Sequence, residues 1–201
     1  MPDRVTLGFD TSAAHCAAAL LRGDVVLAAR HEAMAKGQAE RLMPMLEEVL
    51  AEAGLGWGDL DVIGVGVGPG NFTGIRVAVA AARGLALSLG VPAVGVTATE
   101  AAAFGLPRPC RVVLEWRGGA LIWQDFDAEA KTASPGPDGG SRPRQAAAGA
   151  LPPGPAPAAP ALPRAEAGAH LAARAADRPA LPRPAPCDLR PAAAAPARAP
   201  A

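Results

Sequence analysis

The sequence predicts an α/β fold in which a mixed sheet carries packed helices, and two observations lead to it. Three short segments near the N-terminus have strand patterns and are joined by tight turns, as in an antiparallel meander. Residues 61–68 form an apolar strand that is followed by a long apolar helix and a second apolar strand. That order is typical of a right-handed βαβ unit with parallel pairing, so the sheet is expected to contain both pairings.

The expected elements follow from these patterns in chain order. The strands cover residues 4–12, 16–21, 25–32, 61–68 and 92–98, and residues 110–127 form a hairpin that turns at Gly118 and Gly119. The first helix covers residues 38–54, and Pro44 either kinks its first turn or marks where the helix proper starts. The second helix covers residues 71–90 and ends at Gly90. Residues 164–177 are rich in alanine and could form one more helix.

Composition divides the chain into unlike parts. All seven phenylalanines and tryptophans lie at or before Phe126, while 16 of the 22 prolines lie in residues 130–201. The later part has few large side chains to bury against the entropy of ordering them. We therefore expect one lobe over residues 1–105, the start of a second lobe over 106–130, and a degenerate, largely flexible remainder over 131–201.

Charge and cysteine content argue against several classes of protein. Nineteen basic side chains balance nineteen acidic ones, so the chain has no overall positive field with which to grip nucleic acid by itself. The three cysteines are far apart and odd in number, which favours reduced thiols and a cytoplasmic protein. No signal peptide is visible, and the longest nearly uncharged apolar run has 13 residues, against the roughly 20 that span a bilayer, so no membrane is expected.

The stretch GVGPGNFTGIR, residues 66–76, is the first candidate for a binding site. A Walker loop needs a lysine and then a hydroxyl residue after its last glycine, but Ile75 and Arg76 follow Gly74. The dinucleotide-binding pattern fails as well, because Thr73 stands where its third glycine belongs. A phosphate cradle stays an alternative, since helix N-termini attract anions in general.

A structural role for this stretch needs fewer assumptions. Gly68 and Gly70 allow a sharp exit from the strand, and Asn71 or Thr73 can cap the helix that starts near Gly74. That helix is apolar on more than one side and has only two charged residues. We expect one of its sides to meet the sheet and another to meet a partner.

These residues resemble the TsaB (YeaZ) family of bacterial proteins. The resemblance rests on LGFDTS near the N-terminus, on GPGNFTGIR after an apolar strand, and on AERLMPMLEEVLAEAG between them, and it covers residues 4–105. It implies an actin-like ATPase (ASKHA, ribonuclease H-like) fold. The second half is less similar, and the middle of the second lobe is shortened.

The resemblance also implies a function. It implies a non-catalytic scaffold, a pseudoenzyme, in the complex that forms N6-threonylcarbamoyladenosine next to the anticodon of tRNAs reading codons that start with A. It implies a heterodimer with a TsaD-type catalytic subunit, which is expected to hold ATP and the metal, and a TsaE-type ATPase in the full complex. Contact with tRNA is expected only through that complex, and the same helices could support a homodimer.

The resemblance points to particular residues. The partner surface of the family comes from its first two helices, which by position implies Leu42, Met43, Met45, Leu46, Ile75, Arg76, Val79 and Arg83. The resemblance implies no catalytic residue, and no metal site is expected, because the three histidines are not spaced to present two ligands from one helix. Asp10, Thr11 and Ser12 resemble the first phosphate loop of actin-like proteins, but such side chains close turns equally well.

Two other functions stay open. An actin-fold small-molecule kinase or ATPase would use Asp10, although one carboxylate is thin support for phosphoryl transfer. A decayed homologue would have an unstable second lobe. His15 and Cys16 do not suggest a base and a nucleophile, because neighbouring residues of a strand point to opposite faces.

Overall fold

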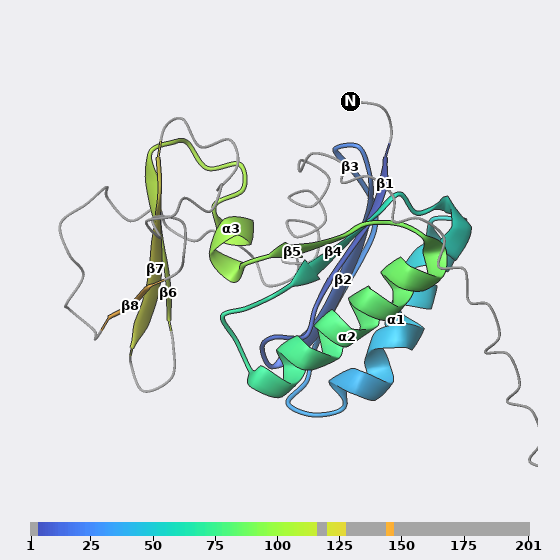
Figure 1. Ribbon diagram of the computed structural model, residues 1–201, viewed down its shortest axis with the longest axis horizontal. Coiled ribbons are helices and arrows are strands. Elements are labelled where there is room, and N and C mark those ends of the chain that lie inside the picture. The colour runs from blue at the N-terminus through green and yellow to red at the C-terminus, as the bar shows by residue number, and fades with distance from the viewer. Residues whose placement is uncertain (1–3, 116–119, 128–143, 147–201) are drawn as a thin grey trace, which may run out of the picture.

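The computed structural model describes residues 4–115, 120–127 and 144–146. Figure 1 shows a larger sheet with two helices lying across one of its faces, and a smaller sheet beside it. The larger sheet has the strand order β3-β2-β1-β4-β5, and the smaller has the order β6-β7-β8. Neighbours among β1, β2 and β3 are antiparallel, while β4 pairs in parallel with both β1 and β5. The predicted mixed sheet is confirmed.

The expected elements have bounds close to those predicted, whereas η1 and α3, given below, were not expected. The strands of the larger sheet are β1 (Val5–Asp10), β2 (His15–Arg22), β3 (Val25–Ala33), β4 (Val62–Gly66) and β5 (Ala93–Val96). The smaller sheet consists of β6 (Cys110–Glu115), β7 (Leu121–Phe126) and β8 (Arg144–Ala146). The helices are α1 (Gln38–Glu52), α2 (Phe72–Leu89) and α3 (Ala98–Ala102), with a short 3-10 turn η1 (Trp57–Asp59).

The structure decides one open alternative and adds one element that was not expected. Helix α1 begins at Gln38, as expected, and contains Pro44, so the alternative in which the helix proper starts at the proline is excluded. Strand β8 lies within residues 131–201, where no strand was expected, because pairing with the backbone of β7 forms it and needs no large side chains. The expected turn at Gly118 and Gly119 and the expected helix over 164–177 lie outside the described residues.

The main core lies between the larger sheet and helices α1 and α2. Alternate residues of the central strands point into it, and Leu7, Phe9 and Ile63 are fully buried there. The matching stripe of α1 includes Leu46 and Val49, which are also fully buried. The fully buried residues of α1 are large, whereas those of α2 are the small residues Gly74, Ala78 and Ala82. Larger side chains of α2, such as Val79 and Leu85, pack against this core and stay partly exposed.

The smaller sheet is stabilised by a partly buried ion pair. Nε and Nη2 of Arg111 donate to the two carboxylate oxygens of Asp125 at 2.5 and 2.7 Å, and the guanidinium lies 4.5 Å from the ring centre of Trp123. Thr99 of α3 donates its hydroxyl to Gln124 of β7 at 2.5 Å, which ties α3 to the smaller sheet.

Parallel pairing of β1 with β4 positions the candidate site. Phe9 pairs with Val65, so both strands end at the same edge of the sheet. The turn that follows β1 and the glycine-rich loop that follows β4 therefore leave the sheet side by side.

Candidate functional site

The turn after β1 is closed by its own side chains. Asp10 Oδ1 accepts a hydrogen bond from the Ser12 backbone amide at 3.0 Å, and Oδ2 accepts one from the Ser12 hydroxyl at 2.9 Å. His15 Nε2 lies 3.0 Å from the same Oδ2, and both side chains are largely buried, with 14% of His15 and 10% of Asp10 exposed. All of these contacts are internal to the protein, and they hold the carboxylate of Asp10 in a turn-closing role.

The glycine-rich loop packs directly on this turn. Thr11 donates its hydroxyl to the Gly74 carbonyl oxygen at 2.6 Å, and the Asn71 amide donates to the Ser12 carbonyl oxygen at 2.5 Å. A β-carbon on Gly70 would overlap Ser12, and one on Gly74 would overlap the Thr11 carbonyl oxygen. The close approach of two backbones explains both glycines, and no ligand is needed to account for them.

The start of α2 is also capped internally. Asn71 Oδ1 accepts from the amides of Thr73 and Gly74 at 2.9 and 3.3 Å, so Asn71 is the N-cap and Thr73 is not. Gly68 has a φ of 84°, which favours glycine, and its carbonyl oxygen accepts from the Ala98 amide at 2.9 Å. Two amides that would attract a phosphate are already engaged, which supports the structural role predicted for this loop.

Sequence reasoning missed the contact between Asp10 and His15. Asp10 pairs with Ala17 across β1 and β2, and His15 is on the same face as Ala17, two residues away. His31 pairs with Ala17 from the other side, and its ring centre lies 5.0 Å from that of His15. Only the strand register could have revealed this cluster. Within the described ranges, no group of three or more His, Cys, Asp or Glu side chains is arranged to hold a metal.

Cys16 is not a nucleophile paired with His15. It is fully buried in the main core, on the opposite face of β2 from His15. Burial, with a smaller contribution from the nearby Glu32 carboxylate, raises the pKa of its thiol to about 11. The thiol is therefore protonated at neutral pH, as expected for a structural cysteine.

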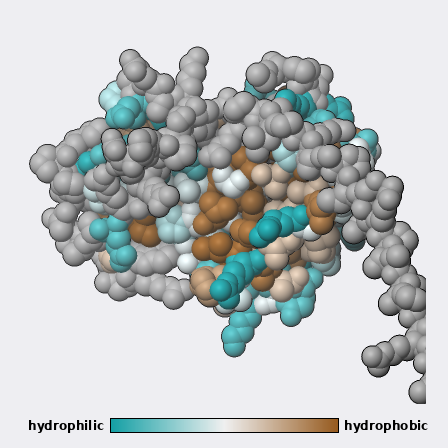
Figure 2. All heavy atoms as spheres, viewed as in Figure 1, coloured by the Kyte–Doolittle hydropathy of each residue, from teal (hydrophilic) through white to brown (hydrophobic). Residues whose placement is uncertain are grey.

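Helix α2 is apolar but mostly not buried by its own chain. Only Gly74, Ala78 and Ala82 are buried among its 18 residues. On the outer face, Phe72 and Leu87 are each 66% exposed. Figure 2 shows that the surface over α2 is largely hydrophobic and is crossed by a few hydrophilic side chains. An apolar face of this kind on a helix is typical of an interaction site.

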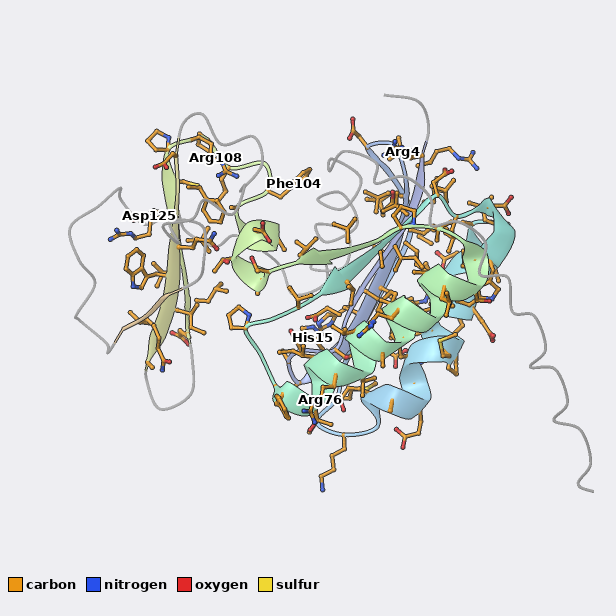
Figure 3. The ribbon with its side chains drawn as sticks, in the orientation of Figure 1. Arg4, His15, Arg76, Phe104, Arg108 and Asp125 are labelled. Carbon is orange, nitrogen blue, oxygen red and sulfur yellow. The ribbon has the colours of Figure 1, made fainter. Side chains whose placement is uncertain are left out.

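Two arginines lie on this outer face. Arg76 and Arg83 are exposed, and the guanidinium carbon of Arg76 lies 3.8 Å from the ring centre of Phe72. Figure 3 shows Arg76 near the N-terminal end of α2. The ion pairs found among the described residues do not involve either arginine, and α2 contains no acidic residue. The outer face is thus apolar and positively charged.

The residues expected at a partner surface are only partly on the surface. Leu42, Met45 and Leu46 are at most 1% exposed, because the stripe of α1 that they form packs against the sheet. Their assignment to a partner surface is corrected, since a partner could not reach them in this fold. Met43, one position along the helix, is 37% exposed and remains a candidate.

Of the four α2 residues predicted at the partner surface, two are exposed and two are half-buried. Arg76 and Arg83 are exposed, whereas Ile75 and Val79 are half-buried, and Val79 packs against the main core. Sequence reasoning missed the two most exposed apolar residues, Phe72 and Leu87. The signal was available, because the exposed residues Phe72, Arg76, Arg83 and Leu87 are separated by four, seven and four positions, a helical spacing.

Helix α2 also meets the length and composition of a membrane span. Its 18 residues have a mean hydropathy of 1.4, and 17% of them are buried. Core helices of proteins without any membrane contact meet the same criterion, and α2 packs on β4, β1 and β5. The expectation that the chain has no membrane contact stays a prediction.

Comparison with known protein families identifies the family of this chain. The sequence model described as TsaD, tRNA N6-adenosine threonylcarbamoyltransferase, matches residues 31–136, more than half of the chain. The chain belongs to this family. A curated tRNA N6-adenosine threonylcarbamoyltransferase from Erythrobacter litoralis is 37% identical over 76 residues, and the match covers 30% of this chain and 22% of that relative.

Solved structures confirm the expected type of protein and its fold. YeaZ from Pseudomonas aeruginosa superposes with a TM-score of 0.54 at 29% identity, covering 72% of this chain and 65% of YeaZ. A second structure, of a protein similar to peptidase YEAZ from the same organism, has the same score and identity and is covered to 64%. The chain is thus a TsaB (YeaZ) type of protein with the predicted actin-like fold, and it spans just under two thirds of these YeaZ structures and about a fifth of the curated relative.

Proposed function

We propose that this chain is a non-catalytic subunit in the formation of N6-threonylcarbamoyladenosine in tRNA, and that it binds a TsaD-type catalytic subunit through the outer face of α2. The observation that carries the proposal is the exposure of this face. Phe72 and Leu87 each leave about two thirds of their surface in water, at opposite ends of a helix that has only two charged residues. Covering such a face is favourable by about 25 cal/mol per Å² of apolar surface.

The state of the strand-end turn supports a non-catalytic role. The Asp10 carboxylate is engaged by Ser12 and His15, and the glycine-rich loop lies against the same turn. A kinase of the actin-like fold would need this carboxylate and space for phosphate beside it. ATP and the metal are accordingly assigned to the catalytic partner.

The remaining parts of the proposal follow from the same assignment. A TsaE-type ATPase would join the full complex, and tRNA would be contacted only through it, because this chain has no excess of positive charge. The complex would act in the cytoplasm. The same outer face of α2 could support a homodimer when the catalytic subunit is absent.

Co-expression with a TsaD-type subunit tests the proposal. We expect the two proteins to elute together in size-exclusion chromatography. The variant Leu87→Glu should abolish co-elution, because it places a charge in the apolar part of the contact. Ser88→Glu is the matched control, since Ser88 is also exposed but lies farther around the helix, away from the stripe that contains Phe72 and Leu87.

The result also separates the alternatives. Wild-type protein that stays apart from a folded, active TsaD-type subunit contradicts the proposal. Loss of co-elution in Ser88→Glu as well as in Leu87→Glu contradicts the assignment to the outer face of α2. Titration calorimetry of the isolated chain with ATP and magnesium addresses the kinase alternative, which requires tight binding and turnover that is lost in Asp10→Asn.

A further inference from the structure

The exposed face of α2 has the same pattern from either end of the helix. Phe72 and Leu87 are each 66% exposed, and the exposed arginines Arg76 and Arg83 lie between them. Each arginine is four positions from the nearer apolar residue, and seven positions separate the two arginines. These side chains therefore share one face of the helix, in the order apolar, basic, basic, apolar.

The charges of the two arginines are not used within the described part of the chain. The ion pairs found there do not include Arg76 or Arg83, and α2 itself has no acidic residue. In contrast, Arg30 and Arg41 are held in ion pairs that link β3 with α1. The guanidinium of Arg76 instead lies over the ring of Phe72, 3.8 Å from its centre (Figure 3). Positive charge and apolar surface thus form one patch.

The α2 helix of a second copy of this chain would match this patch poorly. In an antiparallel contact, Phe72 would meet Leu87 of the second copy, but Arg76 would meet Arg83. In a parallel contact, each arginine would meet its own counterpart. Like charges that face each other across an interface oppose association. Two α2 helices can therefore join their apolar residues only by bringing like charges together.

The α1 helix of a second copy offers the opposite charge but little apolar surface. Glu40 and Glu47 are exposed on α1, and they too are seven positions apart. The one large apolar side chain that α1 exposes is Met43, at 37%. One helix of a second copy thus supplies either the apolar match or the charge match, but not both.

Because the patch requires both matches, we propose that it binds a helix of the partner that is apolar and acidic on the same face. Two carboxylates about seven residues apart would face Arg76 and Arg83, and large apolar side chains would cover Phe72 and Leu87. This inference rests on the proposed function, to which it adds the chemistry that selects the partner. The same two arginines attract this partner and repel a second copy, so selection uses attraction and repulsion together.

The salt dependence of two associations tests this inference. The dissociation constant of the complex with a TsaD-type subunit should rise about two- to tenfold between about 50 mM and about 500 mM NaCl, because salt screens attraction between exposed charges. Self-association of the isolated full-length chain, measured by analytical ultracentrifugation, should become stronger over the same range. The sign is opposite because salt then screens repulsion between the arginines.

A neutral double variant separates the charges from the apolar contact. Arg76→Gln with Arg83→Gln should weaken the complex about two- to tenfold at low salt and remove most of its salt dependence. The same variant should self-associate more tightly than the wild type. Arg4→Gln with Arg22→Gln is the matched control, because it removes the same charge at residues beside β1 and β2, outside α2. The control should leave both associations unchanged.

The outcomes separate this inference from the proposed function. A complex whose dissociation constant does not change with salt, or that the neutral variant forms as tightly as the wild type, overturns this inference and leaves the proposed function standing. Self-association that is no stronger in the neutral variant overturns the selection against a second copy. Equal effects of the control variant would assign the salt response to net charge and not to α2. Absence of a complex at every salt concentration contradicts the proposed function, and this inference fails with it.

Discussion

Thr11 donates its hydroxyl to the carbonyl oxygen of Gly74 at 2.6 Å, although the two residues are 63 positions apart in the chain. This hydrogen bond joins the end of β1 to the first turn of α2. It is buried, and it lies where a β-carbon on Gly74 would overlap the Thr11 carbonyl oxygen. The glycine-rich loop and the strand-end turn therefore form one structural unit.

Substitution of Gly74 tests the close approach. Gly74→Ala should destabilise the protein by about 1–3 kcal/mol, because the added methyl group overlaps the Thr11 carbonyl oxygen. Gly84→Ala is the control in the same helix, since Gly84 is exposed and has no neighbour within 4 Å of an added β-carbon. It should stabilise by about 0.5–1 kcal/mol through helix propensity. Thermal unfolding measures the stability of both variants, and a higher melting temperature for Gly74→Ala would contradict the packing described.

Removal of the Thr11 hydroxyl tests the hydrogen bond itself. Thr11→Val keeps the shape of the side chain but removes the hydroxyl that donates to the Gly74 carbonyl oxygen, which should cost about 0.5–1.5 kcal/mol in urea unfolding. Thr11→Ser retains the donor and should cost less. If the two variants were equally stable, the hydroxyl would not contribute as described.

Cys16 should be chemically inert in the folded protein. Burial raises the pKa of its thiol to about 11, so almost no thiolate is present at pH 8. We expect no labelling of Cys16 by iodoacetamide at pH 8, as read by peptide mass spectrometry, and rapid labelling in denaturant. Because the folded-state pKa lies above the ordinary value of 9.0, the contribution of this thiol to stability should be complete below pH 9 and decrease as the pH rises towards 11. Fast labelling of the native protein would show that the core is open at this position.

The ion pair between Arg111 and Asp125 should support the smaller sheet. Asp125→Asn removes the negative charge from a guanidinium that is 3% exposed, and should cost roughly 1.5–3 kcal/mol. Asp127→Asn, at an exposed position just after β7, is the matched control and should change little. Hydrogen exchange of the β6 and β7 amides would localise the loss of stability. An unchanged exchange rate in Asp125→Asn would contradict a stabilising role of the ion pair.

Most elements over residues 4–105 were predictable because their signals are local, although α3 and η1 were not expected. The period of two in β1, the Asn71 cap and the Gly90 stop of α2 each depend on a few neighbouring residues. The function of the stripe on α1 was not predictable in the same way. A period of 3.6 shows that Leu42, Met45 and Leu46 share a face, but it does not say whether the sheet or a partner meets that face.

Features that depend on pairing between distant segments were missed for the same reason. The contact between Asp10 and His15 follows from the register of β1 and β2, which the sequence pattern leaves open. Strand β8 has no strand-like composition and exists through its pairing with β7. In each case the determining interaction lies outside the window that a sequence pattern covers.

The anchoring of α2 at its N-terminal end also affects the thermodynamics of any association at its outer face. Backbone hydrogen bonds from Asn71 to Ser12 and from Ala98 to Gly68 fix the segment before the helix, and Thr11 fixes its first turn. A helix held in this way has little backbone freedom left to lose on complex formation. Association is then opposed mainly by the ordering of a few side chains such as Phe72 and Arg76, so the surface is preorganised for a rigid partner.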